Sequence, residues 1–124
     1  MKFMLDSNVV IAVALAAGEP VRQRMAEYVE GDVVISSGAL AEVMHGSVQG
    51  KPPTVDRLQA LIEEVPVLAF DENAARAYAT IPFKRASCDR LIAAHALSLG
   101  LTVITCNTKD FADVPGLVAE NWMV

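Results

Sequence analysis

Short apolar runs alternate along this chain with longer segments in which apolar residues recur at helical spacing. Each run stops at polar or turn residues, which is typical of short buried strands. The predicted strands are Phe3–Leu5, Val33–Ser36, Pro66–Phe70 and Leu101–Thr105, with a possible edge strand at Leu117–Ala119.

The segments between these runs carry helix start and stop signals. Capping residues precede them, and glycine or proline follows several of them. The predicted helices are Val9–Ala17, Val21–Glu30, Ala39–Val48, a helix from Thr54 through Val65, a helix from Asp71 that Pro82 ends, and Ser87–Leu99, which Gly100 ends.

This alternation of strands and helices predicts one α/β domain over residues 1–124. Strands separated by helices pair in parallel, and the helices then cover both faces of the sheet. We therefore expect a three-layer fold around a mostly parallel sheet of four to five strands. A chain of 124 residues buries a sufficient core without disulfides or a structural metal.

The last helix is almost entirely apolar, yet it carries Asp89 near its start. At about 100° per residue, Asp89 lies on the same side as Ile92, Ala93 and Ala96, which should face the interior. An ionised carboxylate there costs free energy unless a partner offsets it. Asp89 is therefore either a site residue or a first-turn carboxylate that the helix N-terminus stabilises.

Three other acidic residues occupy comparable places: Asp6 and Asp110 follow apolar strands, and Glu42 follows the second strand. Helical periodicity alone treats Glu42 as solvated. In a parallel sheet, however, all these carboxylates approach one edge, where two charges about 4 Å apart repel by about 4 kcal/mol. Such a cluster binds a cation or shifts its pKa values, and oxygen ligands favour Mg²⁺ or Mn²⁺. Carboxylate-held metal ions suit phosphodiester hydrolysis.

The net charge of -5 argues against a protein that holds nucleic acid by general electrostatics. A phosphate-containing substrate would need a bound cation or a local basic patch. Basic side chains do cluster in sequence around the acidic positions, namely Lys84, Arg85, Arg90 and Lys109. They either grip phosphates or belong to a solvated loop.

The two cysteines, Cys88 and Cys106, are too few for a disulfide framework and lack zinc-ligand spacing. We expect them to be small apolar fillers in a reduced, cytoplasmic protein. His45 and His95 have no partner at ligand spacing, which predicts surface or packing roles.

Polar residues 6–8 interrupt the N-terminal apolar stretch, unlike a secretory signal, and no apolar run reaches the 18 or so residues of a membrane span.

Three blocks of sequence resemble one known family. LDSNVVI at Leu5–Ile11, ALAEVMHG at Ala39–Gly46, and CDRLIAAHALSLGLTVITCNTKDFADVPGLVAENW at Cys88–Trp122 are similar to the PIN-domain ribonucleases, specifically the VapC-type toxins of bacterial toxin–antitoxin pairs. The resemblance covers nearly the whole chain, and the last block is highly specific.

The resemblance implies a PIN-like fold and a metal-dependent endoribonuclease that hydrolyses structured RNA such as tRNA or rRNA. It also implies one or two Mg²⁺ or Mn²⁺ ions, an inhibitory antitoxin, and a homodimer or a toxin–antitoxin hetero-oligomer. The acidic set carries over to Asp6, Glu42 and Asp89, and Asn107 or Asp110 completes it. The supporting residues are Ser7, whose hydroxyl can orient a neighbouring carboxylate, with Asn8, Thr105 and Asn107.

This chain departs from the family in the short IPFKRAS connector before Asp89, where many members carry a longer loop containing glycine. Two alternatives remain open. One is a catalytically inactive PIN fold that only binds a partner, although the acidic positions are kept. The other is a receiver-type phosphoacceptor, which needs an aspartate after the third strand and a lysine after a later one. Asp71 and Lys109 are the available matches.

Overall fold

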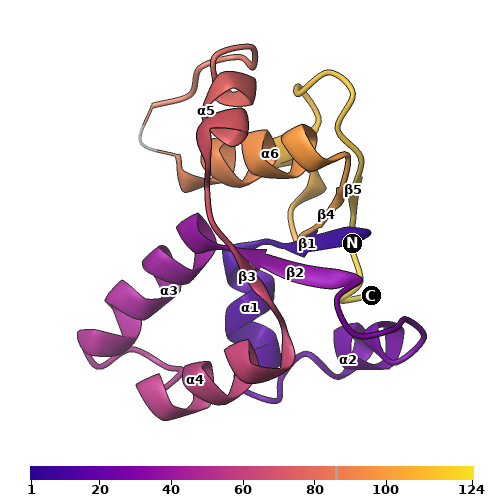
Figure 1. Cartoon of the computed structure of the whole chain (residues 1–124). Coiled ribbons are helices and arrows are strands. Elements are labelled where there is room, and N and C mark those ends of the chain that lie inside the picture. Colours follow the sequence, from indigo (N-terminus) through magenta and orange to yellow (C-terminus); the bar gives the residue numbers. More distant parts are fainter. Residues whose placement is uncertain (86) are drawn as a thin grey trace.

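The computed structural model describes residues 1–85 and 87–124 and contains a single parallel sheet within them (Figure 1). The strand order is β3-β2-β1-β4-β5 and every neighbouring pair is parallel, as the sequence predicted. The strands are β1 (Phe3–Leu5), β2 (Val33–Ser36), β3 (Val67–Leu68), β4 (Thr102–Ile104) and β5 (Ala119–Glu120).

The central strand β1 pairs with β2 on one side and β4 on the other, so that Leu5 lies beside both Ile35 and Ile104. Each of these three side chains is fully buried. Burial on both faces explains why these strands are continuous apolar runs rather than alternating patterns. The carboxyl ends of β1, β2 and β4 therefore meet at one edge of the sheet.

Helices form the two outer layers. In Figure 1, α1 to α4 lie below the sheet, whereas α5 and α6 pack together above it. The helices are α1 (Ser7–Ala14), α2 (Glu19–Met25), α3 (Ser37–Val48), α4 (Val55–Glu64), α5 (Glu72–Tyr78) and α6 (Cys88–Leu99), with a short 3₁₀ helix η1 (Thr108–Phe111) after β4. The predicted three-layer α/β fold is confirmed, and η1 is an element that the sequence pattern did not predict.

Several element boundaries differ from the prediction because capping residues act earlier than the apolar periodicity suggests. Helix α1 starts at Ser7, since Asp6 is its N-cap, and it ends at Ala14. Helix α2 starts at Glu19, and Pro20 lies in its first turn instead of only terminating α1. The predicted caps Thr54 and Asp71 are confirmed, each accepting a hydrogen bond from a backbone N–H.

The core contains the packing histidine that the sequence predicted. His95 is buried, and its Nδ1 lies 2.8 Å from Ser36 Oγ beneath the edge of the Phe70 ring. His45 lies exposed on α3. The described residues include no helix that combines the length and the apolar character of a membrane span.

Candidate active site

Asp6 lies at the carboxyl end of β1 and is held by both of its carboxylate oxygens. Its Oδ1 accepts the backbone N–H of Ser7 at 2.8 Å, and its Oδ2 accepts the Thr105 hydroxyl at 2.8 Å. The side chain is only 4% exposed. A carboxylate fixed by a helix start and by the end of a neighbouring strand has little freedom to rotate, so the orientation of the Asp6 carboxylate is set before any ligand arrives.

The charges of other carboxylates affect the pKa of Asp6. Burial raises the pKa of Asp6, the donors Thr105 and Ser7 oppose that rise, and the charges of Glu42 and Asp110 add to it. Because Glu42 and Asp110 come from α3 and η1, the structure brings three separate chain segments to this edge of the sheet.

The pKa of Asp89, the second residue of α6, is raised by the same cluster. Burial raises its pKa from the usual 3.8 to about 6, and the carboxylates of Asp6, Asp110 and Glu42 contribute to the rise. A first-turn carboxylate stabilised by its own helix would have a lowered pKa instead. Asp89 is therefore a member of the acidic cluster and not a simple helix cap.

Glu42 is solvent-exposed on α3, as its helical position predicted. Helix α3 packs against α6, and the half-buried Cys88, the residue before Asp89, donates its Sγ–H to the Gly38 carbonyl of α3 at 3.7 Å. Burial, then Glu42 and the other carboxylates, raise the pKa of the Cys88 thiol to about 12. Cys88 is therefore a neutral thiol at neutral pH.

Asp110 and Asn107 occupy the segment that follows β4. Asn107 Nδ2 donates to Asp110 Oδ2 at 2.9 Å, while the Asn107 backbone N–H donates to Thr105 Oγ1 at 3.0 Å. Thr105 in turn donates to Asp6. Of the two candidates for the fourth acidic position, Asp110 is the carboxylate that acts on Asp6 and Asp89, and Asn107 orients it.

Three of the sequence predictions need correction. Arg90 is 1% exposed and is bound to Asp113, so it does not face RNA phosphates. The buried Ser7 hydroxyl has no hydrogen-bond partner among the described residues, and its backbone N–H is the group that orients Asp6. Asn8 is exposed on α1, and its supporting role stays a prediction. Cys106 is exposed and is therefore not an apolar filler.

Asp71, which a receiver-type domain would need as its phosphoacceptor, is the N-cap of α5. Its Oδ1 accepts the Ala74 backbone N–H at 3.0 Å. This contact gives Asp71 a structural role, and it is not among the carboxylates that raise the pKa of Asp6 or Asp89.

Sequence reasoning missed Asp113, which partners the buried Arg90. Arg90 Nη2 lies 2.9 Å from Asp113 Oδ1, and the same guanidinium donates to the backbone carbonyls of Pro82 and Asp110. The Arg90–Asp113 pair thus joins α6, the connector before it and η1. No periodicity or motif in the sequence pointed to this pair.

The acidic cluster has the donor chemistry of a magnesium or manganese site. Its members offer carboxylate oxygens, and their mutual repulsion is relieved by a cation. No three His, Cys, Asp or Glu side chains converge closely enough to enclose an ion among the residues that the structure describes. Glu42 is exposed. The carboxylate oxygens of Asp6, Asp89, Glu42 and Asp110 match a divalent ion in the kind of donor atom that they offer.

A pH dependence of stability follows from the raised pKa of Asp89. The folded state keeps this proton up to about pH 6 and the unfolded chain loses it near 3.8, so ionisation destabilises the metal-free fold as the pH rises between these values. Asp89→Asn should therefore raise the free energy of unfolding at pH 7.5 in EDTA by about 1–2 kcal/mol, after discounting for solvent exposure and for the lost helix N-terminal charge.

Urea unfolding of both proteins at pH 4.5 and pH 7.5 measures this effect. At pH 4.5 the free energy of unfolding of Asp89→Asn should exceed that of wild type by less than half of the difference at pH 7.5. The reason is that the wild-type carboxyl is mostly protonated in the folded state at pH 4.5. An equal difference at the two pH values would contradict the assignment.

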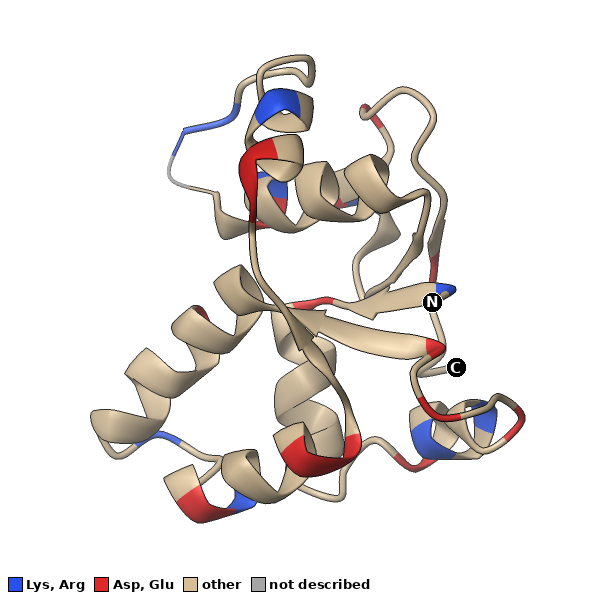
Figure 2. Ribbon diagram, in the orientation of Figure 1, with Lys and Arg blue, Asp and Glu red and all other residues tan. Residues whose placement is uncertain are grey.

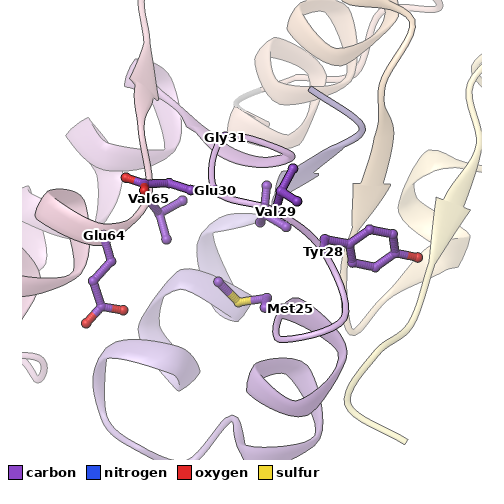
Figure 3. A pocket seen from close by; sticks show the side chains of 8 residues that line it. Met25, Tyr28, Val29, Glu30, Gly31, Glu64 and Val65 are labelled. Carbon is purple, nitrogen blue, oxygen red and sulfur yellow. The ribbon is translucent and has the colours of Figure 1, made fainter.

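A second concavity lies away from these carboxylates, at the amino end of β2 (Figure 3). It has a volume of about 160 Å³ and includes Met25, Tyr28, Val29 and Val65. Two glutamates, Glu30 and Glu64, also line it. It contains no member of the acidic cluster.

Comparison with known proteins connects this geometry with one family. The PIN domain model matches residues 3–117. The chain is 32% identical to the tRNA(fMet)-specific endonuclease VapC of Shigella flexneri over 98% of both chains. It is 32% identical to a chain of the DNA-bound VapBC complex of Salmonella typhimurium, with a TM-score of 0.80 and 98% of each chain covered. The fold also matches VapBC2 of Rickettsia felis with a TM-score of 0.87, at 23% identity over 98% of this chain and 99% of that one.

Proposed function

The chain belongs to the PIN domain family, and from that premise we propose that it is a metal-dependent endoribonuclease acting on structured RNA. It is a toxin of the VapC type, with an antitoxin protein as its partner. The observation that supports metal-dependent cleavage is the set of carboxylates at the carboxyl edge of the sheet, which raise the pKa of Asp6 and Asp89.

In this proposal, Asp6, Glu42, Asp89 and Asp110 hold one or two Mg²⁺ or Mn²⁺ ions. When bound, such an ion activates water, neutralises charge on the phosphate oxygens and stabilises the leaving oxygen. Thr105 and the Ser7 backbone N–H fix both oxygens of Asp6 at 2.8 Å, and Asn107 fixes Asp110 at 2.9 Å. These contacts keep the acidic ligands oriented as substrate arrives.

The proposed substrate is tRNA. The Shigella relative is a tRNA(fMet)-specific endonuclease, and the similarity spans both chains almost completely. Exposed cations lie near the acidic cluster in an otherwise acidic protein: Lys84 and Arg85 before α6, and Lys109 in η1. Part of the connector between α5 and α6 is blue in Figure 2, and Lys84 and Arg85 in it supply positive charge for phosphate groups.

Removal of metal tests the proposal directly. Purified protein freed of antitoxin should cut a mixed tRNA and rRNA pool into defined fragments with Mg²⁺ or Mn²⁺, and EDTA should slow cleavage by about tenfold or more. The readout is fragment mapping by sequencing of the new RNA ends.

Asp6→Ala, purified in the same way, is the control for contaminating nucleases. Equal cleavage by the variant would assign the activity to a contaminant. A folded, metal-loaded wild-type protein that cuts no RNA would instead favour a PIN fold that only binds a partner.

A further inference from the structure

Phe83 has an unusual position for an aromatic side chain, because it is 78% exposed. Phe3, Phe111 and Trp122 are buried, and Tyr28, Phe70 and Tyr78 are partly covered. Exposure of one large ring on a connector gives no packing energy to the fold. The ring is therefore available to a ligand that approaches this connector.

The residues after Phe83 are the exposed cations Lys84 and Arg85. This aromatic-basic segment, residues 83–85, lies on the connector between α5 and α6, shortly before the α6 turn that carries Asp89. An aromatic face beside two cations, in a chain of net charge -5, is suited to a nucleobase with its flanking phosphates.

The segment is anchored to the acidic site through the Arg90–Asp113 pair. Lys84 Nζ lies 3.7 Å from Asp113 Oδ1, and Arg90 Nη1 donates to the Pro82 carbonyl at 3.4 Å. The same arginine donates to the carbonyl of Asp110. One buried guanidinium therefore fixes the position of the connector relative to η1, which carries a carboxylate of the site.

We propose that the aromatic-basic segment is a subsite for one unpaired nucleotide next to the cleaved phosphate, with Phe83 stacking on its base and Arg85 contacting its phosphate. This inference rests on the proposed ribonuclease function and specifies its substrate class. A base inside a helix already stacks on both faces, so only a loop or a single strand can offer a free base to Phe83. The enzyme is thereby directed to unpaired positions of structured RNA.

Kinetics and binding of Phe83 variants test the subsite. Wild type, Phe83→Ala, Phe83→Trp and Phe83→Leu would be assayed on a hairpin cut in its loop, and on the same loop sequence annealed to a complementary strand. Phe83→Ala should raise KM by roughly tenfold or more with kcat within about twofold. Tryptophan should restore KM and leucine should not, because stacking requires an aromatic face.

Binding provides a readout without turnover. In an Asp89→Asn background, a 2-aminopurine in the loop should be quenched on binding, and Phe83→Ala should remove the quenching. Val29→Ala is the matched control, since Val29 is a 73% exposed apolar residue at the other end of the sheet. Its KM should equal that of wild type.

The outcomes separate this inference from the proposed function. If wild type shows metal-dependent cleavage, two results would overturn the subsite alone. One is an unchanged KM in Phe83→Ala, and the other is equal cleavage of the loop and of the annealed strand. Loss of antitoxin binding by Phe83→Ala with unchanged RNA kinetics would assign the ring to the protein partner instead. Absence of cleavage by wild type would contradict the ribonuclease proposal itself.

Discussion

Replacement of Asp89 by asparagine is expected to reduce RNA cleavage by about a thousandfold while leaving the fold intact. The substitution removes a negative charge with little change in volume. In the proposed metal site, it leaves Asp6, Glu42 and Asp110 with less charge to hold a divalent ion, and such an ion would contribute several kcal/mol of transition-state stabilisation. The measurement is the single-turnover rate on end-labelled tRNA with saturating Mg²⁺, together with Mn²⁺ affinity from calorimetry.

Asp56→Asn is a matched control for this variant. Asp56 is the second residue of α4, as Asp89 is of α6, but it is exposed and is not among the carboxylates that raise the pKa of Asp6 or Asp89. Both substitutions remove an acidic group from the first turn of a helix, so they lose the same interaction with the helix dipole. Asp56→Asn should keep full activity. Full activity and unchanged Mn²⁺ affinity in Asp89→Asn would exclude Asp89 from the metal site.

Arg90→Met should lower the free energy of unfolding by about 2–4 kcal/mol, the largest stability effect expected of any charged residue in this site. The Arg90 side chain is 1% exposed and supplies donors to two backbone carbonyls, those of Pro82 and Asp110. Methionine fills much of the volume of the arginine stem but donates no hydrogen bond, so both carbonyls lose a partner. Asp113 also loses the guanidinium that, through a hydrogen bond, lowers its pKa.

Urea unfolding at pH 7.5 measures the loss, and Arg76→Met is the control. Arg76 has an ion pair with Glu72 at 2.7 Å but is 74% exposed, so its removal should cost less than about 0.5 kcal/mol. We also expect Arg90→Met to impair cleavage more than its remaining folded fraction explains, since η1 carries Asp110. Equal unfolding midpoints for Arg90→Met and wild type would show that the pair does not hold these segments together.

The sequence determined the main features of this fold. Short apolar runs identified the strands, because a parallel sheet buried on both faces needs continuous apolar segments. Local capping chemistry identified helix starts at Thr54 and Asp71, since a cap depends only on neighbours in the chain. Asp6 and Asp89 were apparent as carboxylates placed among apolar residues, and the VapC-type resemblance was carried by three contiguous blocks.

The tertiary structure alone decided how these residues meet. The periodicity of α3 predicts that Glu42 faces solvent, and only the packing of α3 on α6 brings it to Cys88 and Asp89. Arg90 was expected at the surface, yet burial pairs it with Asp113. Helical periodicity ranks the faces of one element by polarity. It carries no information on which charge from another element will lie opposite, because that depends on how the layers pack.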